Sequence, residues 1–153
     1  MFLPVASKSL LSRPDCYKEY FLQATTSSKR LIGVRVIAAM AFLIAGTGLF
    51  ILGAQPIAVG LFSPPWDKLA HIGTFAMIGC AAGVASGSQG WLRAACCFAG
   101  ALALGVADEL HQVYLPGRSA SWADLVADAA GGIAGAALLH FVQTVKVRHL
   151  MNH

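Results

Sequence analysis

The sequence predicts an all-α fold: a polytopic membrane protein, built as a bundle of four transmembrane helices with cytoplasmic N- and C-termini. The first observation is composition, since 57% of the 153 residues are hydrophobic and 12% are charged, against about a quarter charged in soluble domains. Such a chain has too few polar residues to cover a surface that faces water. The second is that its apolar residues form four runs long enough to cross a bilayer. The third is that these runs lack barrel alternation, which leaves helices as the structure that a bilayer admits.

The N-terminal part divides into a tail and a first span. Residues 1–30 are mixed and polar, and we expect a cytoplasmic tail that is either poorly ordered or lies on the membrane as a short amphipathic piece around residues 17–22. Residues 31–54 form the first predicted span, in which Arg35 is close enough to the end to reach the interface. Residues 55–65 then form a loop that closes on two prolines.

Three further spans follow at short intervals. The second is predicted over residues 67–86, the third over 91–112 and the fourth over 122–145. The membrane domain therefore covers residues 31–146, and residues 147–153 form a C-terminal cytoplasmic tail.

The positions of the basic residues predict the orientation. Most of the 11 lysines and arginines fall on one side of the predicted bundle, which by the positive-inside rule is the cytoplasmic side. These are Lys8, Arg13, Lys18, Lys29, Arg30, Arg35, Arg93, Lys146 and Arg148. Only Lys68 and Arg118 fall on the outer side.

Two other classes of function find no support. The basic residues do not form a stripe interleaved with aromatic residues on a folded unit, so nucleic acid is not an expected partner. The 4 cysteines have no CxxC spacing and three lie in apolar runs, which indicates packing residues and not a disulfide frame or zinc site.

The scarce polar residues gather at the predicted outer ends of three spans. They are Asp67, Lys68 and His71 on the second, Asp108, Glu109 and Gln112 on the third, Arg118 in the next loop, and Asp124 and Asp128 on the fourth. Residues 91–107 span about 25 Å as a helix, against a hydrocarbon core of about 30 Å. Asp108 and Glu109 therefore lie near the outer boundary, and we expect the set to converge at one level.

The spacing places pairs of these side chains on shared helix faces. Asp67 and His71 are four residues apart, as are Asp124 and Asp128. His71 and Asp128 are a turn deeper, where a lone charge costs about 2.5 to 3.5 kcal/mol. Such groups should point into the bundle and pair with one another.

Some of these residues have simpler explanations. Ser121 and Asp124 fit an S-x-x-D capping box, and Asp67 fits the acidic first turn of a helix. His111 is expected to face the loop. Capping does not account for Glu109, Gln112 and Asp128 in the same leaflet, which favours a functional polar pocket over a purely structural network.

Glycines predict which spans lie closest together. Gly79, Gly83 and Gly87 recur every fourth residue in the second span, and Gly131 and Gly135 continue from Ala127 in the fourth. Small residues at this spacing let helix backbones approach. Spans two and four are therefore the expected close neighbours, which would hold His71 near Asp128.

The chain resembles the VanZ-like family of membrane proteins over residues 66–135. The resemblance rests on Asp67-Lys68-x-x-His71-x-x-x-Phe75, then Asp108-Glu109-x-x-Gln112, then Pro116-Gly117-Arg118-x-x-Ser121-x-x-Asp124, followed by Gly131. It implies a link to teicoplanin resistance and chemistry on lipid head groups or lipid-linked cell-envelope precursors. The family usually has asparagine where Asp128 stands, so this chain adds an acid there.

The pocket suggests a hydrolase or transferase of the outer leaflet. His71 or Glu109 would be general acid or base, with Asp67, Asp108 and Asp124 as further catalytic residues. Lys68, Gln112, Arg118 and Asp128 would bind substrate, with Arg118 and Lys68 holding phosphate or another anion. The acids could also bind a divalent cation through oxygen. No serine or cysteine stands out as a nucleophile.

Two alternatives remain open on the sequence. One is a non-catalytic protein that binds a lipid, antibiotic or partner and alters the envelope. The other is a small proton-coupled carrier, for which four spans are few and no inverted repeat is evident. In each case the expected location is the cytoplasmic membrane of a bacterium, with the bilayer as partner and the oligomeric state left open.

Overall fold

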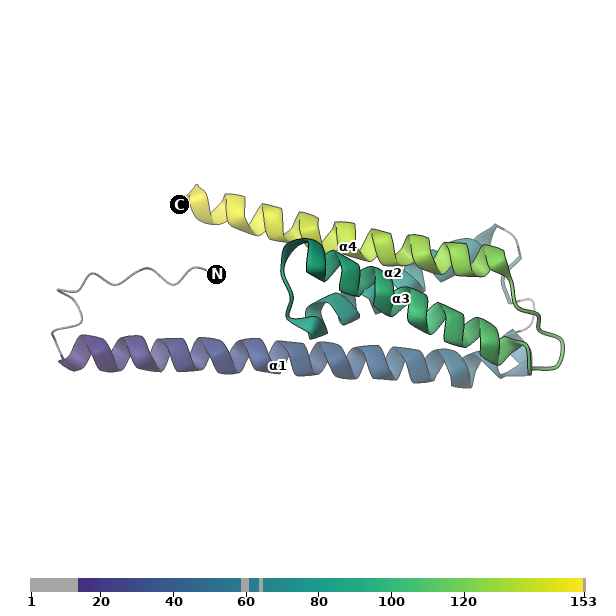
Figure 1. Ribbon diagram of the computed structural model, residues 1–153, viewed down its shortest axis with the longest axis horizontal. Coiled ribbons are helices and arrows are strands. Elements are labelled where there is room, and N and C mark those ends of the chain that lie inside the picture. The colour runs from purple at the N-terminus through teal and green to yellow at the C-terminus, as the bar shows by residue number, and fades with distance from the viewer. Residues whose placement is uncertain (1–13, 59–60, 64, 153) are drawn as a thin grey trace. The chain divides into compact units, whose positions relative to one another are not determined.

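The computed structural model describes residues 14–58, 61–63 and 65–152, and this part of the chain is all-helical. Its elements are α1 (Pro14–Gly53), a 3-10 helix η1 (Pro56–Ala58), α2 (Trp66–Ser86), α3 (Gly90–Gln112) and α4 (Trp122–Met151) (Figure 1). Each of the four α-helices is long and apolar enough to cross a membrane. The predicted all-α polytopic membrane fold is confirmed.

Two predicted boundaries differ from the structure. Helix α1 begins at Pro14, so much of the predicted tail is helical, and its membrane-compatible part begins at Phe21 instead of residue 31. The first thirteen residues, with Lys8 and Arg13, lie outside the described residues. Helix α4 continues to Met151, beyond the predicted end at residue 145. In α1 and α4 the helix continues through polar residues beyond the apolar run. The predicted ends were taken from hydropathy, whereas the hydrogen bonds of a helix join backbone groups whatever the side chains are.

The chain divides into two compact units, residues 1–34 and 35–153. The described part of the first unit is the N-terminal portion of α1, where Thr26 Oγ1 donates a hydrogen bond to the carbonyl oxygen of Leu22 at 2.8 Å. The second unit contains the remainder of α1 together with α2, α3 and α4, and it holds all the candidate site residues.

Helices α2 and α4 pack closely because glycines on α4 leave no side chain between the two backbones. A Cβ atom on Gly131 would lie 2.7 Å from the carbonyl oxygen of Ile72, and one on Gly135 would lie 2.5 Å from that of Ala76. The prediction that spans two and four are close neighbours is confirmed. Gly87 does not continue the strip on α2: it ends the helix, with φ of 66° and its N–H donating to the carbonyl oxygen of Val84.

Helix α3 completes a three-helix core. A Cβ on Gly79 would lie 3.0 Å from the carbonyl oxygen of Cys97, so α2 also approaches α3 at a glycine. Phe75 and Ile78 of α2 and Ala101 of α3 are buried together at the centre. Cys97 is buried and free, in agreement with its predicted packing role.

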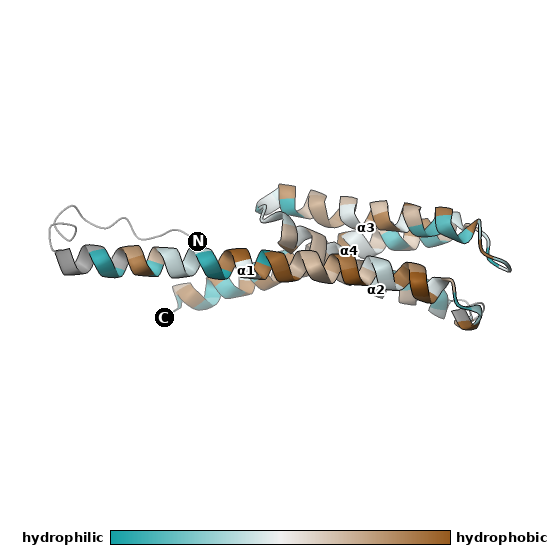
Figure 2. Ribbon diagram, turned by 90° about the horizontal axis from the view of Figure 1, so that it is seen from below, coloured by the Kyte–Doolittle hydropathy of each residue, from teal (hydrophilic) through white to brown (hydrophobic). Residues whose placement is uncertain are grey.

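The second-unit part of α1 contacts this core through side chains. Phe42 and Leu49 pack against the buried cluster. The Arg35 guanidinium donates to the carbonyl oxygens of Ala85 and Ser86 at 3.3 and 3.1 Å, at the C-terminal end of α2. Much of this part of α1 is coloured as hydrophobic in Figure 2, and its side chains Ile37, Met40, Leu43, Ile44 and Leu52 are exposed. Such a surface is compatible with lipid and not with water.

Successive helices run in opposite directions, which gives the second unit two different ends. At one end is the short α2–α3 connection, where Arg93 donates to the carbonyl oxygen of Ser88 at 2.8 Å. At the other end are the segment between α1 and α2 and the α3–α4 connection, residues 113–121 (Figure 1). The polar residues singled out in the sequence lie at this second end, and we call it the polar end.

Candidate functional site

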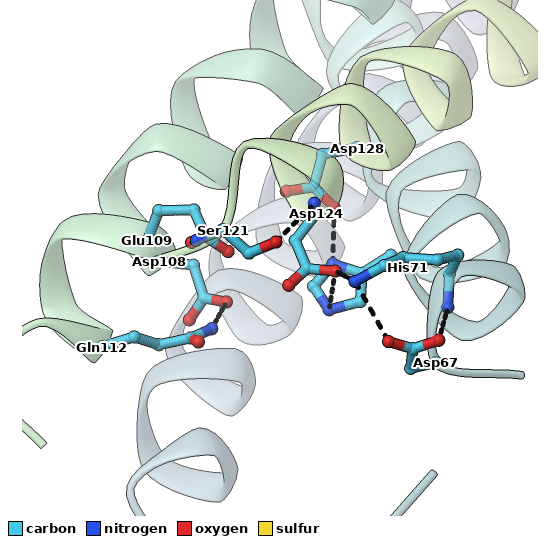
Figure 3. A network of polar contacts seen from close by, with 9 residues as sticks. Asp67, His71, Asp108, Glu109, Gln112, Ser121, Asp124 and Asp128 are labelled. Atoms are coloured by element: carbon cyan, nitrogen blue, oxygen red, sulfur yellow. Dashed lines mark hydrogen bonds and ion pairs between the residues drawn. The ribbon is translucent and has the colours of Figure 1, made fainter. Parts of the chain in front are cut away.

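A chain of charged side chains joins the start of α2 to the start of α4. Lys68 Nζ lies 3.0 Å from Asp67 Oδ2 and is also hydrogen-bonded to Asp124 Oδ1. One turn deeper, His71 Nδ1 lies 2.7 Å from Asp128 Oδ1. His71 Nε2 is 3.8 Å from Asp124 Oδ1, beyond hydrogen-bond reach. Figure 3 shows Asp124 and Asp128 beside His71, so the predicted convergence of α2 and α4 is found.

The depth of Asp128 explains why it needs this partner. Its side chain is 0% exposed, whereas that of His71 is 23% exposed. The imidazole also stacks on Phe75, four residues further along α2, with ring centroids 6.0 Å apart. The ring is therefore held between an aromatic face and a buried carboxyl group, which limits its rotation.

A glycine on α3 makes room for Asp128. A Cβ on Gly105 would lie 2.6 Å from Asp128 Oδ2 and 3.0 Å from Asp128 Cβ. Gly105 was not among the predicted site residues. It lies three and four residues before Asp108 and Glu109, so its position on the same helix face was readable from the sequence.

Helix α3 contributes two buried carboxyl groups and an amide. Gln112 Nε2 donates to Asp108 Oδ2 at 2.8 Å, one turn away on the same helix. Glu109 Oε2 accepts a hydrogen bond from the backbone N–H of Ser121 at the start of α4. All three α3 side chains are buried. Through Glu109 and Ser121, α3 is joined to the same region as α2 and α4 (Figure 3).

Only one of the two hydrogen bonds of the predicted capping box forms. Ser121 Oγ accepts from the backbone N–H of Asp124 at 3.3 Å, so Ser121 is the N-cap of α4. The reciprocal bond, from the N–H of Ser121 to Asp124, is replaced by the bond to Glu109. Asp124 is thereby left to pair with Lys68. A local motif could not reveal this exchange, because Glu109 reaches Ser121 only through the tertiary fold.

Arg118 lies at the polar end beside Asp108 and the end of α1. A Cβ on Gly53 would lie 3.9 Å from Arg118 Nη2 and 3.8 Å from Asp108 Oδ1. The tight turn at Gly117, with φ of 76°, directs the connection here. His111 does not face the loop as expected: its ring meets Phe50 of α1 edge-on, with centroids 5.1 Å apart.

The site has an excess of hydrogen-bond acceptors. Three buried carboxyl oxygens, Asp108 Oδ1, Glu109 Oε1 and Asp128 Oδ2, have no hydrogen-bond partner in the described part of the chain. Five acids share this end with Lys68, Arg118 and His71. A buried acceptor without a donor is costly, so the arrangement favours a proton or a donor from a ligand.

The described residues contain no group of three or more His, Cys, Asp or Glu side chains that could hold a metal ion. The acids contact Lys68, His71 and Ser121 and are not arranged around a common point. The described residues therefore do not fit a divalent cation.

All of these positions lie within the match to a known family. The model of the VanZ/LLP1 family matches residues 9–143. The chain belongs to this family. Comparison with curated proteins and with solved structures gives no match.

The match extends well beyond the motif-bearing residues 66–135 that carried the resemblance, and it includes all of α1 and most of α4. In this VanZ-family protein the motif residues of α2, α3 and α4 lie at one end of a compact unit. Lys68, which was expected to hold an anion, is already paired with Asp67 and Asp124. Ser121, not included among the predicted site residues, connects Glu109 to Asp124.

Proposed function

We propose that this VanZ-family protein binds the polar head of a membrane lipid or lipid-linked cell-envelope precursor at its polar end, in the outer leaflet of a bacterial cytoplasmic membrane. We further propose that His71 acts there as general acid and base in a hydrolysis or group transfer. A change in envelope lipids of this kind would connect the protein to the teicoplanin resistance associated with its family.

The observation that carries the proposal is the 2.7 Å contact between His71 Nδ1 and Asp128 Oδ1. A buried carboxylate that accepts the Nδ1–H selects the tautomer in which Nε2 has a free lone pair. The same carboxylate stabilises the imidazolium that forms when Nε2 takes a proton. This is the relation between histidine and aspartate in hydrolytic triads.

The partial exposure of His71, 23%, is what lets a substrate reach it. In the proposed step, Nε2 removes the proton from a water or hydroxyl as its oxygen attacks the head group. The imidazolium then returns that proton to the leaving oxygen, so that the histidine ends as it began. Arg118 is the base proposed to face an anionic group, because a planar guanidinium can hold a phosphate through two parallel hydrogen bonds.

A non-catalytic role is the second candidate, and the Lys68 contacts favour it. An ammonium group held by two carboxylates is a rigid feature, which suits a fixed recognition surface. In that case the polar end would bind a lipid, antibiotic or partner and release it unchanged.

The test compares three variants in a bacterial host at matched membrane abundance. His71→Gln removes the proton carrier, Asp128→Asn keeps an acceptor for Nδ1–H and restores the residue usual in the family, and His140→Gln makes the same chemical change at an exposed site outside the polar end. The readouts are membrane lipid analysis and teicoplanin susceptibility.

We expect His71→Gln to lose the lipid change and the protection, Asp128→Asn to keep part of both, and His140→Gln to match the wild type. Full activity of His71→Gln would rule out the acid–base role. Loss of protection without any lipid difference between wild-type and null membranes would favour the binding role instead. Activity retained in EDTA would rule out a required divalent cation.

A further inference from the structure

An apolar groove lies between the end of α3 and the start of α4. Its lining consists of Val106, Glu109 and Leu110 from α3 and Ala120, Ser121, Trp122 and Leu125 from the connection and α4, and its volume is about 240 Å³. We call it the α3–α4 groove. Apart from Glu109 and Ser121 the lining side chains are apolar, so the groove is suited to hydrocarbon.

The groove faces outward from the helix bundle. Leu110 is 61% exposed and Trp122 is 84% exposed. Both belong to helices that are apolar and long enough to span a membrane. From Val106 to the end of α3 the helix rises by about 9 Å, which corresponds to the outer part of one leaflet. A hydrocarbon chain of the bilayer therefore has direct sideways access.

One polar group in this lining lacks a partner. Glu109 is 6% exposed, and its Oε2 is already used by the N–H of Ser121. Its Oε1 is buried and accepts no hydrogen bond in the described residues. An ionised carboxylate can only accept, so whatever satisfies Oε1 has to donate.

The charge around Glu109 decides what kind of donor fits. Asp108 Oδ1 and Asp128 Oδ2, both from buried side chains, are unpartnered as well. Acids outnumber lysine and arginine five to two at this end of the bundle. A cationic donor is therefore favoured over an anionic or neutral one.

We propose that the α3–α4 groove binds one acyl chain of a phospholipid with a primary-amine head group, which enters sideways from the bilayer and donates from its ammonium to Glu109. This names the substrate class, and the route of entry, for the site in the proposed function, and it rests on that function. A single turn of a second copy's helix, about 10 Å across and about 5.4 Å long with its side chains, has a larger volume than the groove.

Binding is measured on the purified full-length chain by native mass spectrometry after delipidation. The probes are dioleoyl phosphatidylethanolamine, dioleoyl phosphatidylglycerol and the soluble head group glycerophosphoethanolamine. We expect one phosphatidylethanolamine per chain, binding to phosphatidylglycerol weaker by at least about tenfold through the missing charged hydrogen bond, and no binding of the head group alone.

Two substitutions on α3 form a matched pair. Val106→Phe places a ring in the groove, and Ala103→Phe adds the same ring one turn earlier at an exposed position outside it. We expect Val106→Phe to weaken phosphatidylethanolamine binding by about tenfold, because the ring takes the space of the chain. Ala103→Phe should bind as the wild type does.

Glu109→Gln tests the head-group contact. Its amide oxygen can still accept from the N–H of Ser121, so the start of α4 should keep its structure. We expect the preference for phosphatidylethanolamine over phosphatidylglycerol to fall to about one, since the ammonium loses its charged acceptor.

Three results would overturn this inference. The first is equal binding by Val106→Phe and Ala103→Phe, and the second is equal affinity of the wild type for both phospholipids. The third is a wild-type dimer in the mass spectrum that Val106→Phe abolishes, because that would place a second copy in the groove. None of them depends on catalysis. If His71→Gln keeps full activity while Val106→Phe loses the lipid, the acid–base function fails and the groove stands.

Discussion

The carboxyl group of Asp128 is completely buried, and its two oxygens have different surroundings. Oδ1 meets His71 Nδ1 at 2.7 Å, while Oδ2 has no hydrogen-bond partner in the described residues. A lone charge at depth in a membrane costs about 2.5 to 3.5 kcal/mol, so the contact with His71 is what makes an aspartate tolerable here. An asparagine at this position would keep the acceptor without the charge.

The space around Oδ2 leads to a prediction for Gly105→Ala. The added methyl would lie 2.6 Å from Oδ2, which is well inside van der Waals contact. We expect the free energy of unfolding in detergent to fall by about 1 to 3 kcal/mol, the usual cost of overpacking. The imidazole nitrogen resonances of His71 should also move, because Asp128 has to shift.

Gly73→Ala is the matched control, since a Cβ there would meet nothing within 4 Å. Its free energy of unfolding should stay the same or rise by up to about 1 kcal/mol through helix propensity. If both variants behave alike, Gly105 does not act by making room for Asp128.

At the scale of elements, α4 is located by two kinds of contact. Its N-terminus is held by Ser121 as N-cap and by Glu109, which reaches across from α3. Further along, its glycines touch the backbone of α2. Polar contacts at the end and close packing below it together set the rotation of α4, and so bring Asp124 and Asp128 toward Lys68 and His71.

The glycine contact can be tested with Gly135→Ala. The new Cβ would lie 2.5 Å from the carbonyl oxygen of Ala76 and 3.2 Å from the backbone nitrogen of Cys80. Backbone cannot rotate aside as a side chain can, so the helices must separate. We expect a loss of about 1 to 3 kcal/mol in the free energy of unfolding, read by denaturant titration of the purified protein.

Ala134→Val adds apolar bulk at an exposed position of α4 and should leave stability nearly unchanged. Equal loss in both variants would mean that α4 responds to bulk in general and not to its approach to α2.

For the whole molecule, the question is which side of the membrane the polar end faces. The structure separates two ends: Arg35 and Arg93 lie near the α2–α3 connection, and the acids lie at the other end. The positive-inside rule predicts that the acidic end faces out of the cytoplasm. This orientation is a prediction.

Cysteine labelling tests it. In a chain whose native cysteines are replaced, Ser119→Cys lies in the exposed α3–α4 connection and Gln89→Cys in the α2–α3 connection. A membrane-impermeant maleimide added to intact spheroplasts should label Ser119→Cys fully and Gln89→Cys only after lysis. The reverse pattern would invert the orientation and move the proposed site to the inner leaflet, with the helices unchanged.

Much of this architecture could be predicted from the sequence. The apolar runs predicted the first and last residues of α2 and α3 to within one residue. The signal is clear because a helix that crosses a membrane needs an apolar run of a minimum length. The ends of α1 and α4 were less predictable, because their polar turns continue the helix without any hydropathy signal. The candidate site was partly predictable, because spacing of four residues put Asp67 with His71 and Asp124 with Asp128 on shared faces.

The sequence by itself determined the four helices, the family and the end of the bundle at which the polar residues gather. Only the tertiary structure decided the partners: His71 with Asp128, Lys68 with two carboxylates, and Glu109 with the N–H of Ser121. The α3–α4 groove also exists only because α3 and α4 pack together in the tertiary structure. The physical reason is that hydropathy and helical spacing are local, whereas pairing depends on the rotation and separation of helices, which are set where glycines let distant backbones touch.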